Sequence, residues 1–281
     1  MIYPDIDPAA IRFGNFAIHW YGLMYIVGLL AGYWLGRTRA TKPDSSWNPD
    51  DLVDMFFYGA LGVMLGGRVG YVLFYNSSEL LHDPLILFRV WQGGMSFHGG
   101  ILGVAFAMWL YGRKNQRAFF EVTDFMVPLV PIGLGAGRIG NFINGELWGR
   151  PTNEAWGMIF PHVDGELRHP SMLYQAMLEG VVLFVIVWIY SARPRPRMAV
   201  SGLFLACYGV FRFAVEFVRE PDAHIGFVAF GWVTMGHLLS SPMIALGALF
   251  IVLAYKNQPA AIEVSAGEKK PKKGKNFSTV R

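Results

Sequence analysis

An apolar run that begins near residue 120 ends in the segment Gly137-Arg138-Ile139-Gly140-Asn141-Phe142-Ile143-Asn144-Gly145-Glu146-Leu147-Trp148-Gly149-Arg150. An arginine near the end of such a run normally faces the protein interior or a water-filled cavity, because a charge at the centre of a bilayer costs about 2.5–3.5 kcal/mol. Asn141, Asn144 and Glu146 add hydrogen-bonding groups where the helix gives way to a loop. The segment therefore predicts a membrane-spanning helix that ends at a functional site. The alternative is a helix end whose arginine merely reaches the membrane interface.

The composition of the whole chain is typical of a membrane protein. Of the 281 residues, 53% are hydrophobic and 16% are charged, whereas a soluble domain carries about 25% charged residues. The mean hydropathy is +0.35. The net charge of +4 gives no reason to expect nucleic-acid binding, because the basic residues of a membrane protein collect in its cytoplasmic loops. Cys207 is the single cysteine, which excludes an internal disulfide.

Seven apolar stretches are long enough to cross a bilayer as helices. They cover about 18–36, 52–75, 95–111, 120–140, 171–190, 199–218 and 236–255. The sequence thus predicts an all-α polytopic membrane protein with one transmembrane domain over residues 1–256. Gly62, Gly66 and Gly70 have a four-residue spacing that allows close helix packing. The lysine-rich residues 257–281 are expected to form a disordered basic tail.

Basic residues occupy every second connection between the predicted spans. They are Arg37, Arg39, Lys42, Arg113, Lys114, Arg117, Arg193, Arg195, Arg197 and Lys256. Because cytoplasmic loops carry an excess of Lys and Arg, we expect a periplasmic N-terminus and a cytoplasmic C-terminus. The connection over about 141–170 is too long for a tight turn, and we expect it to form a small periplasmic cap between spans four and five.

Several charged residues, which are costly to place in lipid, lie at a similar depth in the predicted membrane topology. Arg68, Arg138 and Arg212 each lie toward the periplasmic end of a predicted span. Tyr208, Arg212 and Glu216 are spaced i, i+4, i+8 and share one helix face. Arginine suits phosphate because its planar fork donates two parallel hydrogen bonds and stays charged when desolvated. The pattern predicts a site for a phospholipid head group. The alternative is a structural ion pair between Arg212 and Glu216.

His98 is the candidate for proton transfer near neutral pH within the bundle, and a hydrogen-bonded packing histidine is the alternative. The histidines are dispersed, and the sequence has no HExxH motif or Cys/His spacing, so no metal is expected. It also has no GxSxG elbow and no Walker loop. We therefore expect no cofactor and a nucleophile that a substrate supplies.

Six motifs together resemble the bacterial prolipoprotein diacylglyceryl transferase family. They are residues 137–150, Ile18-His19-Trp20-Tyr21-Gly22, His98-Gly99-Gly100, His169-Pro170-Ser171-Met172-Leu173-Tyr174, Tyr208-Gly209-Val210-Phe211-Arg212-Phe213 and Glu216-Phe217-Val218-Arg219-Glu220-Pro221-Asp222. The resemblance covers the chain from about residue 10 to 255. It implies a multi-pass inner-membrane enzyme, with its active site toward the periplasmic leaflet, that performs the first step of bacterial lipoprotein maturation.

The resemblance also implies substrates and site residues. The diacylglyceryl group of phosphatidylglycerol would move to the lipobox cysteine thiol of a prolipoprotein signal peptide, with release of glycerol phosphate. His98, Arg138 and Arg212 match the essential positions of the family and are the expected catalytic residues. With the two arginines, the expected substrate-binding residues are Tyr21, Asn141, Asn144, Glu146, Gly149, Tyr208 and Glu216. The expected partners are these two substrates and membrane lipids.

Two other classes of membrane protein stay open at this point. An anion carrier would need accessible polar groups in both halves of the membrane, whereas the predicted inner half of this chain is almost wholly apolar. A phosphotransferase that acts on lipid head groups would need metal-ligating acids or a histidine nucleophile motif. The sequence has neither.

Overall fold

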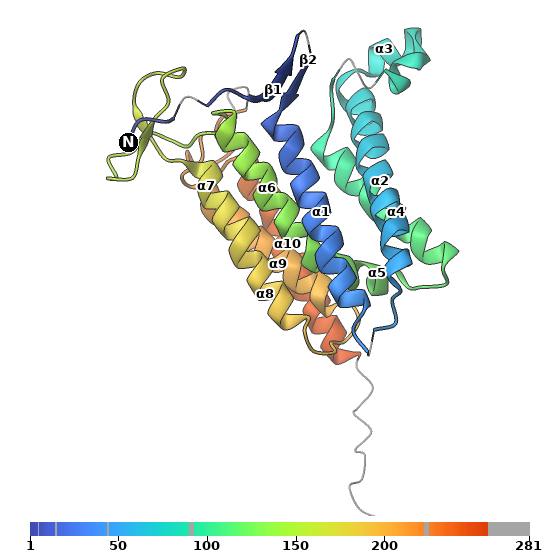
Figure 1. The fold of residues 1–281 in the computed structure, drawn as a ribbon. Coiled ribbons are helices and arrows are strands. Elements are labelled where there is room, and N and C mark those ends of the chain that lie inside the picture. The colour runs from blue at the N-terminus through green and yellow to red at the C-terminus, as the bar shows by residue number, and fades with distance from the viewer. Residues whose placement is uncertain (5, 15, 44, 90–92, 222–224, 258–281) are drawn as a thin grey trace, which may run out of the picture.

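The computed structural model describes residues 1–257 except residues 5, 15, 44, 90–92 and 222–224. Most of the predicted basic tail, residues 258–281, therefore lies outside the described residues, as does Asp222 at the end of the last motif. The described chain is mostly helical and carries two small two-stranded sheets (Figure 1). The prediction of a mostly helical membrane protein is confirmed.

The helices follow the predicted apolar stretches. They are α1 (Trp20–Ala40), α2 (Pro49–Tyr75), α3 (Ser77–His82), α4 (Phe97–Lys114), α5 (Phe119–Met126), α6 (Val130–Ile143), α7 (Ser171–Gln175), α8 (Leu183–Tyr190), α9 (Ala199–Glu216) and α10 (Met235–Lys256). Tighter or wider helical turns join some of them, namely η1 (Pro84–Phe88), η3 (Val127–Leu129) and η4 (Ala176–Val182). The strands are β1 (Ala9–Phe13), paired with β2 (Phe16–His19), and β3 (Met158–Ile159), paired with β4 (Leu167–Arg168).

Five helical segments are long and apolar enough to cross a membrane. They are Pro49–Tyr75, Phe119–Ile143, Ser171–Tyr190, Ala199–Glu216 and Met235–Lys256. The helices α1 and α4 have 21 and 18 residues, but their glycines and the basic residues of their last turns lower their mean hydropathy. Proline explains the break between α5 and α6, because Pro128 and Pro131 lack the N–H groups that continue a helix.

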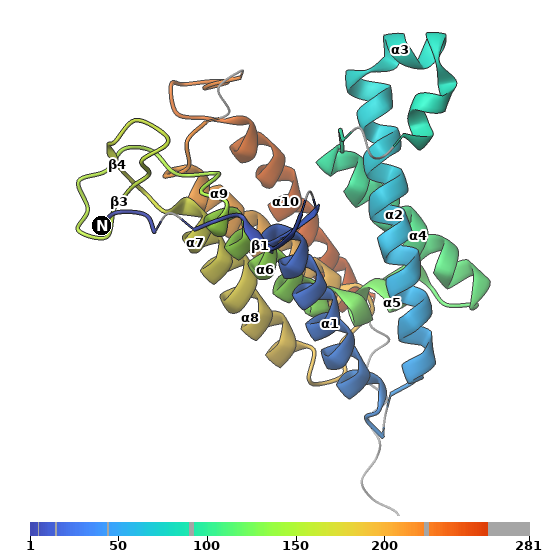
Figure 2. The same cartoon turned by 45° about the horizontal axis from the view of Figure 1, so that its top comes forward.

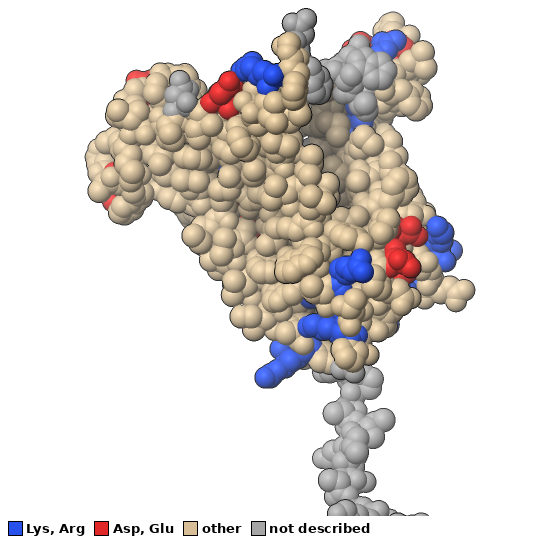
Figure 3. Space-filling model, in the orientation of Figure 1, with Lys and Arg blue, Asp and Glu red and all other residues tan. Residues whose placement is uncertain are grey.

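The helices form two bodies that are joined at one end and diverge at the other (Figures 1 and 2). The main body contains α1 and α6 to α10, and the arm contains α2 and α4 with α3 and η1 at its tip. A shared apolar core joins them, formed by Trp47, Leu52, Met55, Met108, Tyr111, Val122 and Phe125. Basic side chains gather at this end, which we call the basic end (Figure 3). Arg39, Lys114 and Lys256 lie in the last turns of α1, α4 and α10.

Glycines let the two arm helices touch backbone to backbone. A Cβ atom at Gly103 would lie 2.0 Å from the carbonyl oxygen of Gly62, and one at Gly66 would lie 2.3 Å from the carbonyl oxygen of Gly99. No other residue fits these positions without separating α2 from α4. The packing predicted from the four-residue glycine spacing is therefore confirmed.

The opposite end, which we call the loop end, carries the connection 144–170 and residues 217–221 and 225–234. Tyr3 ties the chain start to it, because its backbone N–H donates to the carbonyl of Ile159 (2.9 Å) and its hydroxyl donates to the last carbonyls of α6, those of Phe142 (2.8 Å) and Ile143 (2.7 Å). The ring of Tyr3 stacks on Phe160 in a small apolar core. The connection 144–170 is thus a compact unit over the end of α6.

Candidate active site

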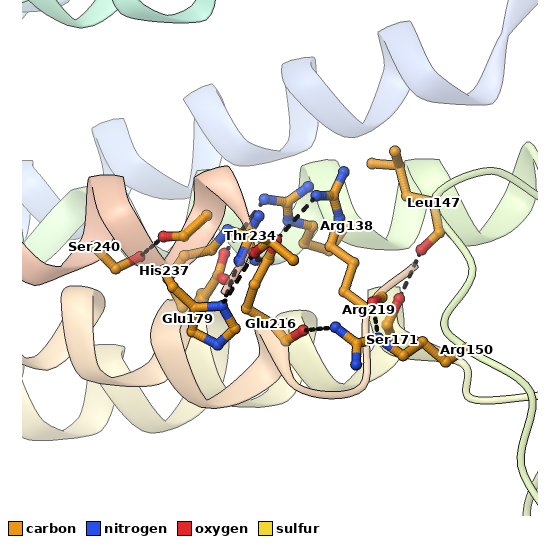
Figure 4. Close-up of polar contacts among 12 residues, drawn as sticks. Arg138, Leu147, Arg150, Ser171, Glu179, Glu216, Arg219, Thr234, His237 and Ser240 are labelled. Atoms are coloured by element: carbon orange, nitrogen blue, oxygen red, sulfur yellow. Dashed lines mark hydrogen bonds and ion pairs between the residues drawn. The ribbon is translucent and has the colours of Figure 1, made fainter. Parts of the chain in front are cut away.

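Arg138 projects from α6, about one turn before the loop end of that helix, toward a buried carboxylate. Its Nη2 atom lies 3.5 Å from Oε2 of Glu179 on η4, and its Nη1 atom lies 3.5 Å from Oδ1 of Asn141 (Figure 4). The Glu179 side chain is fully buried, and its Oε1 atom has no hydrogen-bond partner. A buried carboxylate requires a cationic partner, so Glu179 fixes the position of the Arg138 guanidinium.

The polar residues that follow Arg138 gather around Glu146. Its Oε1 atom accepts hydrogen bonds from Nδ2 of Asn141 (2.8 Å) and of Asn144 (3.3 Å). Tyr21 on α1 interacts with Asn141 through its hydroxyl group and lies within electrostatic range of Glu146. Four predicted site residues from α1 and from the end of α6 therefore form one group.

Arg212 on α9 is held in a similar way by Glu216, one helical turn further on. The Arg212 guanidinium donates to Oε2 of the buried Glu216 carboxylate, and Arg219 lies 3.7 Å from its Oε1 atom. The ion pair that was the alternative to a site role is therefore present. It does not exclude a site role, because Glu179 lies within electrostatic range of Arg138, Arg212 and Arg219.

Tyr208 connects the two arginines, because it interacts with Arg138 through its hydroxyl and lies within electrostatic range of Arg212. The residues around these arginines form what we call the arginine cluster. Its charged members are Arg138, Arg150, Arg212, Arg219, Glu146, Glu179 and Glu216. Four arginines and three glutamates leave a net charge of +1. The arginines of the cluster therefore outnumber its glutamates, which favours an anionic ligand.

Three residues were missed by the sequence analysis: Glu179, the partner of Arg138, and Thr234 and His237 beside Glu216. The Thr234 hydroxyl donates to Oε1 of Glu216 (2.7 Å) and lies 3.1 Å from Nδ1 of His237 (Figure 4). The His237 side chain is buried between the rings of Phe213 and Phe217. Thr234 caps α10 in a Thr-x-x-His pattern before an apolar run, which is a helix-start signal, but nothing in that pattern indicates contact with Glu216.

Gly149 has a backbone role in this arrangement. Its N–H donates to the carbonyl of His169 (2.7 Å), and a Cβ atom at this position would lie 2.5 Å from the carbonyl oxygen of Val218. The neighbouring Arg150 donates to the backbone carbonyls of Arg219 (2.9 Å) and Glu216 (3.3 Å). Gly149 thus lets the loop after α6 lie against the end of α9. Burial lowers the pKa of His169 below its usual value.

The structure places the other two predicted residues away from this cluster. His98 lies in the first turn of α4, in the arm, with an exposed side chain, whereas Arg138 and Arg212 lie in the main body. Arg68 is buried in the arm, where it donates to the carbonyl oxygens of Ile86 (2.6 Å) and Gly94 (3.3 Å). Through these contacts Arg68 stabilises the fold of the arm.

No cluster of three or more His, Cys, Asp or Glu side chains suited to a metal ion occurs in the part of the chain that the structure describes. The arrangement can hold an anionic group between fixed guanidinium forks near one end of the helices. It also offers hydroxyl and amide groups from Tyr21, Asn141 and Tyr208 to orient such a group.

Long apolar helices and a partly buried arginine cluster define a multi-span membrane protein with a polar site near one end of its helices. A family model described as prolipoprotein diacylglyceryl transferase matches residues 8–253. The chain therefore belongs to the prolipoprotein diacylglyceryl transferase family and is a transferase, as its motifs indicate.

Individual relatives agree with this assignment over nearly their full length. The chain is 58% identical to the phosphatidylglycerol–prolipoprotein diacylglyceryl transferase of Ectopseudomonas mendocina over 258 residues, which cover 92% of this chain and 97% of that protein. It is 58% identical to the enzyme of the same name from Azotobacter vinelandii over 257 residues, 91% and 97% of the two chains. The corresponding identity to the Coxiella burnetii enzyme is 54% over 258 residues, 92% and 99% of the two chains.

Proposed function

We propose that this protein transfers the diacylglyceryl group of phosphatidylglycerol to the lipobox cysteine thiol of a prolipoprotein, with release of glycerol phosphate. The observation that carries the proposal is a pair of partly buried arginines, Arg138 on α6 and Arg212 on α9, each held by a buried carboxylate, Glu179 and Glu216 respectively. The excess of arginine over glutamate in the arginine cluster favours an anionic ligand such as a phosphodiester. The relatives are named for the same two substrates.

The proposed topology has seven spans, formed by α1, α2, α4, α5 with α6, α7 with α8, α9 and α10. The basic end faces the cytoplasm and the loop end faces the periplasm of a bacterial inner membrane. Support comes from the basic side chains, which gather at one end of an uncharged belt (Figure 3). Residues 1–256 then form one catalytic domain with a periplasmic cap over about 141–170, and residues 257–281 form a cytoplasmic tail.

The proposed reaction is a displacement at one carbon of phosphatidylglycerol. This is the carbon of the diacylated glycerol that is bonded to the phosphate oxygen. The cysteine thiol loses its proton, and the thiolate forms a C–S bond with this carbon. The C–O bond to phosphate breaks, and glycerol phosphate leaves with the electron pair. Arg138 and Arg212 stabilise the charge that grows on the departing phosphate, because their guanidinium groups are already fixed by Glu179 and Glu216.

The thiol has an unperturbed pKa near 8.5, so a base is needed at neutral pH. We propose His98 as this base, with a tyrosine or the substrate phosphate as alternatives. Tyr21, Asn141, Asn144, Glu146, Tyr208 and Glu216 are proposed to bind or orient the substrates. Gly149 supports them by keeping the loop after α6 close to α9.

The test is to incubate the purified protein with phosphatidylglycerol and a lipobox peptide, and to measure glycerol phosphate. We expect release with a cysteine peptide and none with the matched serine peptide, because the serine hydroxyl is a much weaker acid and nucleophile. Equal release with both peptides would indicate hydrolysis of the lipid and contradict the proposed acceptor. No release with either peptide would contradict the proposed reaction.

A further inference from the structure

A cavity of about 430 Å³ lies at the basic end, between the end of α1 and the connection from α8 to α9. Five basic side chains line it: Arg39, Lys42, Arg193, Arg195 and Arg197. They come from two parts of the chain that are about 150 residues apart in sequence, and the fold brings them around one space. Membrane orientation alone does not require these five basic residues to surround one cavity. Basic residues scattered over the cytoplasmic loops would satisfy the positive-inside rule equally well.

Arg39 forms the inner wall of this cavity. Its guanidinium lies between the rings of Phe125 and Trp188, at 5.3 Å and 5.6 Å from their centroids, and its Nη1 atom donates to Oγ of Ser191 (2.6 Å). Its Nε atom is buried without a hydrogen-bond partner, and among the described residues it has no carboxylate within ion-pair distance. A partly buried arginine without an ion pair leaves a positive charge that an anion would neutralise.

The two acidic residues that line the cavity are already occupied. Asp124 accepts hydrogen bonds from the backbone N–H groups of Met198 (2.6 Å) and Ser201 (2.8 Å) and from the Ser201 hydroxyl (2.6 Å). Glu121 forms an ion pair with Arg117, which does not line the cavity. Asp124 therefore holds the start of α9, and its charge offsets part of the positive charge of Arg39. The basic side chains still outnumber the acids, five to two, among the described residues that line the cavity.

We propose that this cavity is a binding site for a phosphate group, separate from the arginine cluster at the loop end. Arginine forks and serine hydroxyls are suitable donors to phosphate oxygens, and Ser45 and Ser46 line the cavity beside the basic residues. The phosphate belongs either to an anionic lipid of the adjacent leaflet or to a soluble phosphate compound. A bound phosphate would fasten α1 to the α8–α9 connection.

The test uses the full-length purified protein in an uncharged detergent. Dioleoyl phosphatidic acid is titrated, and the retained lipid is counted by native mass spectrometry for the unaltered protein and for Arg193→Gln/Arg197→Gln. The matched control is Arg113→Gln/Lys114→Gln, which removes the same charge at the basic end but from exposed residues of α4 outside the cavity. We expect the cavity variant to bind about tenfold more weakly, or about 1.4 kcal/mol, and the control to bind normally.

A second titration with inorganic phosphate identifies the source of the phosphate. Displacement of phosphatidic acid by inorganic phosphate from the unaltered protein would support a site for a soluble compound, and resistance to displacement would support a lipid site. Equal weakening in the cavity variant and the control would overturn the proposal, as would the absence of saturable binding by either probe. Lys42→Gln, at another exposed position of the cavity, gives an independent variant that should weaken binding in the same direction.

Discussion

Two buried glutamates each hold one arginine of the proposed catalytic pair. Glu179 is opposite Arg138, and Glu216 is opposite Arg212. Carboxylates in such positions are costly unless they are paired, so each glutamate and its arginine stabilise one another in a fixed geometry. Fixed donors need no reorganisation when charge develops on a departing phosphate. The pairs are thus compatible with catalysis as well as with structure.

We expect Arg138→Ala and Arg212→Ala each to lower the rate of transfer by about 10²–10³, the usual effect of removing one donor to a developing oxyanion. Arg138→Lys should recover little activity, because an ammonium group cannot donate two parallel hydrogen bonds. The measurement is the initial rate of glycerol phosphate release at saturating phosphatidylglycerol. Full activity of Arg138→Lys would show that a point charge is sufficient.

Thr234 offers a test of the contacts that hold Glu216. Thr234→Val keeps the shape of the side chain but removes its hydrogen bond to the Glu216 carboxylate. A hydrogen bond to a charged group contributes about 1.5–3 kcal/mol, so both the transfer rate and the unfolding temperature should fall. Thr234→Ser retains the hydroxyl and should stay close to the unaltered protein. An unchanged rate in Thr234→Val would contradict a link between Thr234 and the arginine cluster.

At the residue scale, sequence patterns identified the site residues of the segment 138–146 better than their partners on other helices. Arg138, Asn141 and Glu146 occupy one short segment, so their proximity follows from chain connectivity. Glu179 carried a usable signal, a carboxylate inside an apolar span, although its partner on another helix was not predictable. Arg68 is also an arginine within an apolar span, as Arg138 is. In the structure, however, its guanidinium donates to the backbone carbonyls of Ile86 and Gly94 in the arm.

The glycine contacts between α2 and α4 give a prediction for an element. Gly103→Ala would place a methyl group 2.0 Å from the carbonyl oxygen of Gly62, so the two helices must separate. We expect a loss of stability of about 1–3 kcal/mol, the usual cost of overpacking. Gly133→Ala on α6 is the control, because a Cβ atom there meets no atom within 4 Å. Unfolding temperatures compare the two variants, and an equal effect of both would contradict close packing.

At the element scale, hydropathy was sufficient to locate the helices because each predicted stretch became helical. It did not predict the wide turn η4, which lies within an apolar run and carries Glu179. Hydropathy also could not predict which helices pack together. The faces of α2 and α4 that meet are no more apolar than the faces that contact lipid. The division into a main body and an arm depends on such pairings and is visible only in three dimensions.

The proposed role of His98 depends on how the arm and the main body are arranged. His98 lies in the arm and the arginine cluster lies in the main body, so a proton could pass from the thiol to His98 only when the substrate bridges the two bodies. The two bodies are joined at the basic end and diverge at the loop end (Figure 2), so a substrate that reaches both would have to lie between them.

We expect His98→Gln to lower transfer by about 10²–10⁴ at neutral pH, the range of general base catalysis. The loss should shrink as the pH rises toward 8.5, because the thiol then ionises without a base. Rate measurements at several pH values, with the unaltered protein as the control, separate this effect from a folding defect. Normal turnover of His98→Gln at neutral pH would dismiss it as the base.

The contact between the chain start and the loop end sets an order on assembly during synthesis. Tyr3 meets Ile159 and the last carbonyls of α6, so its partners leave the ribosome more than 130 residues after it does. The first residues must wait at the membrane surface while most of the helices are inserted. Completion of the helix end beside Arg138 therefore waits for residues 142 and 143, and the contact of Tyr3 with Ile159 forms later still. A nascent chain that stops before residue 142 would lack both contacts.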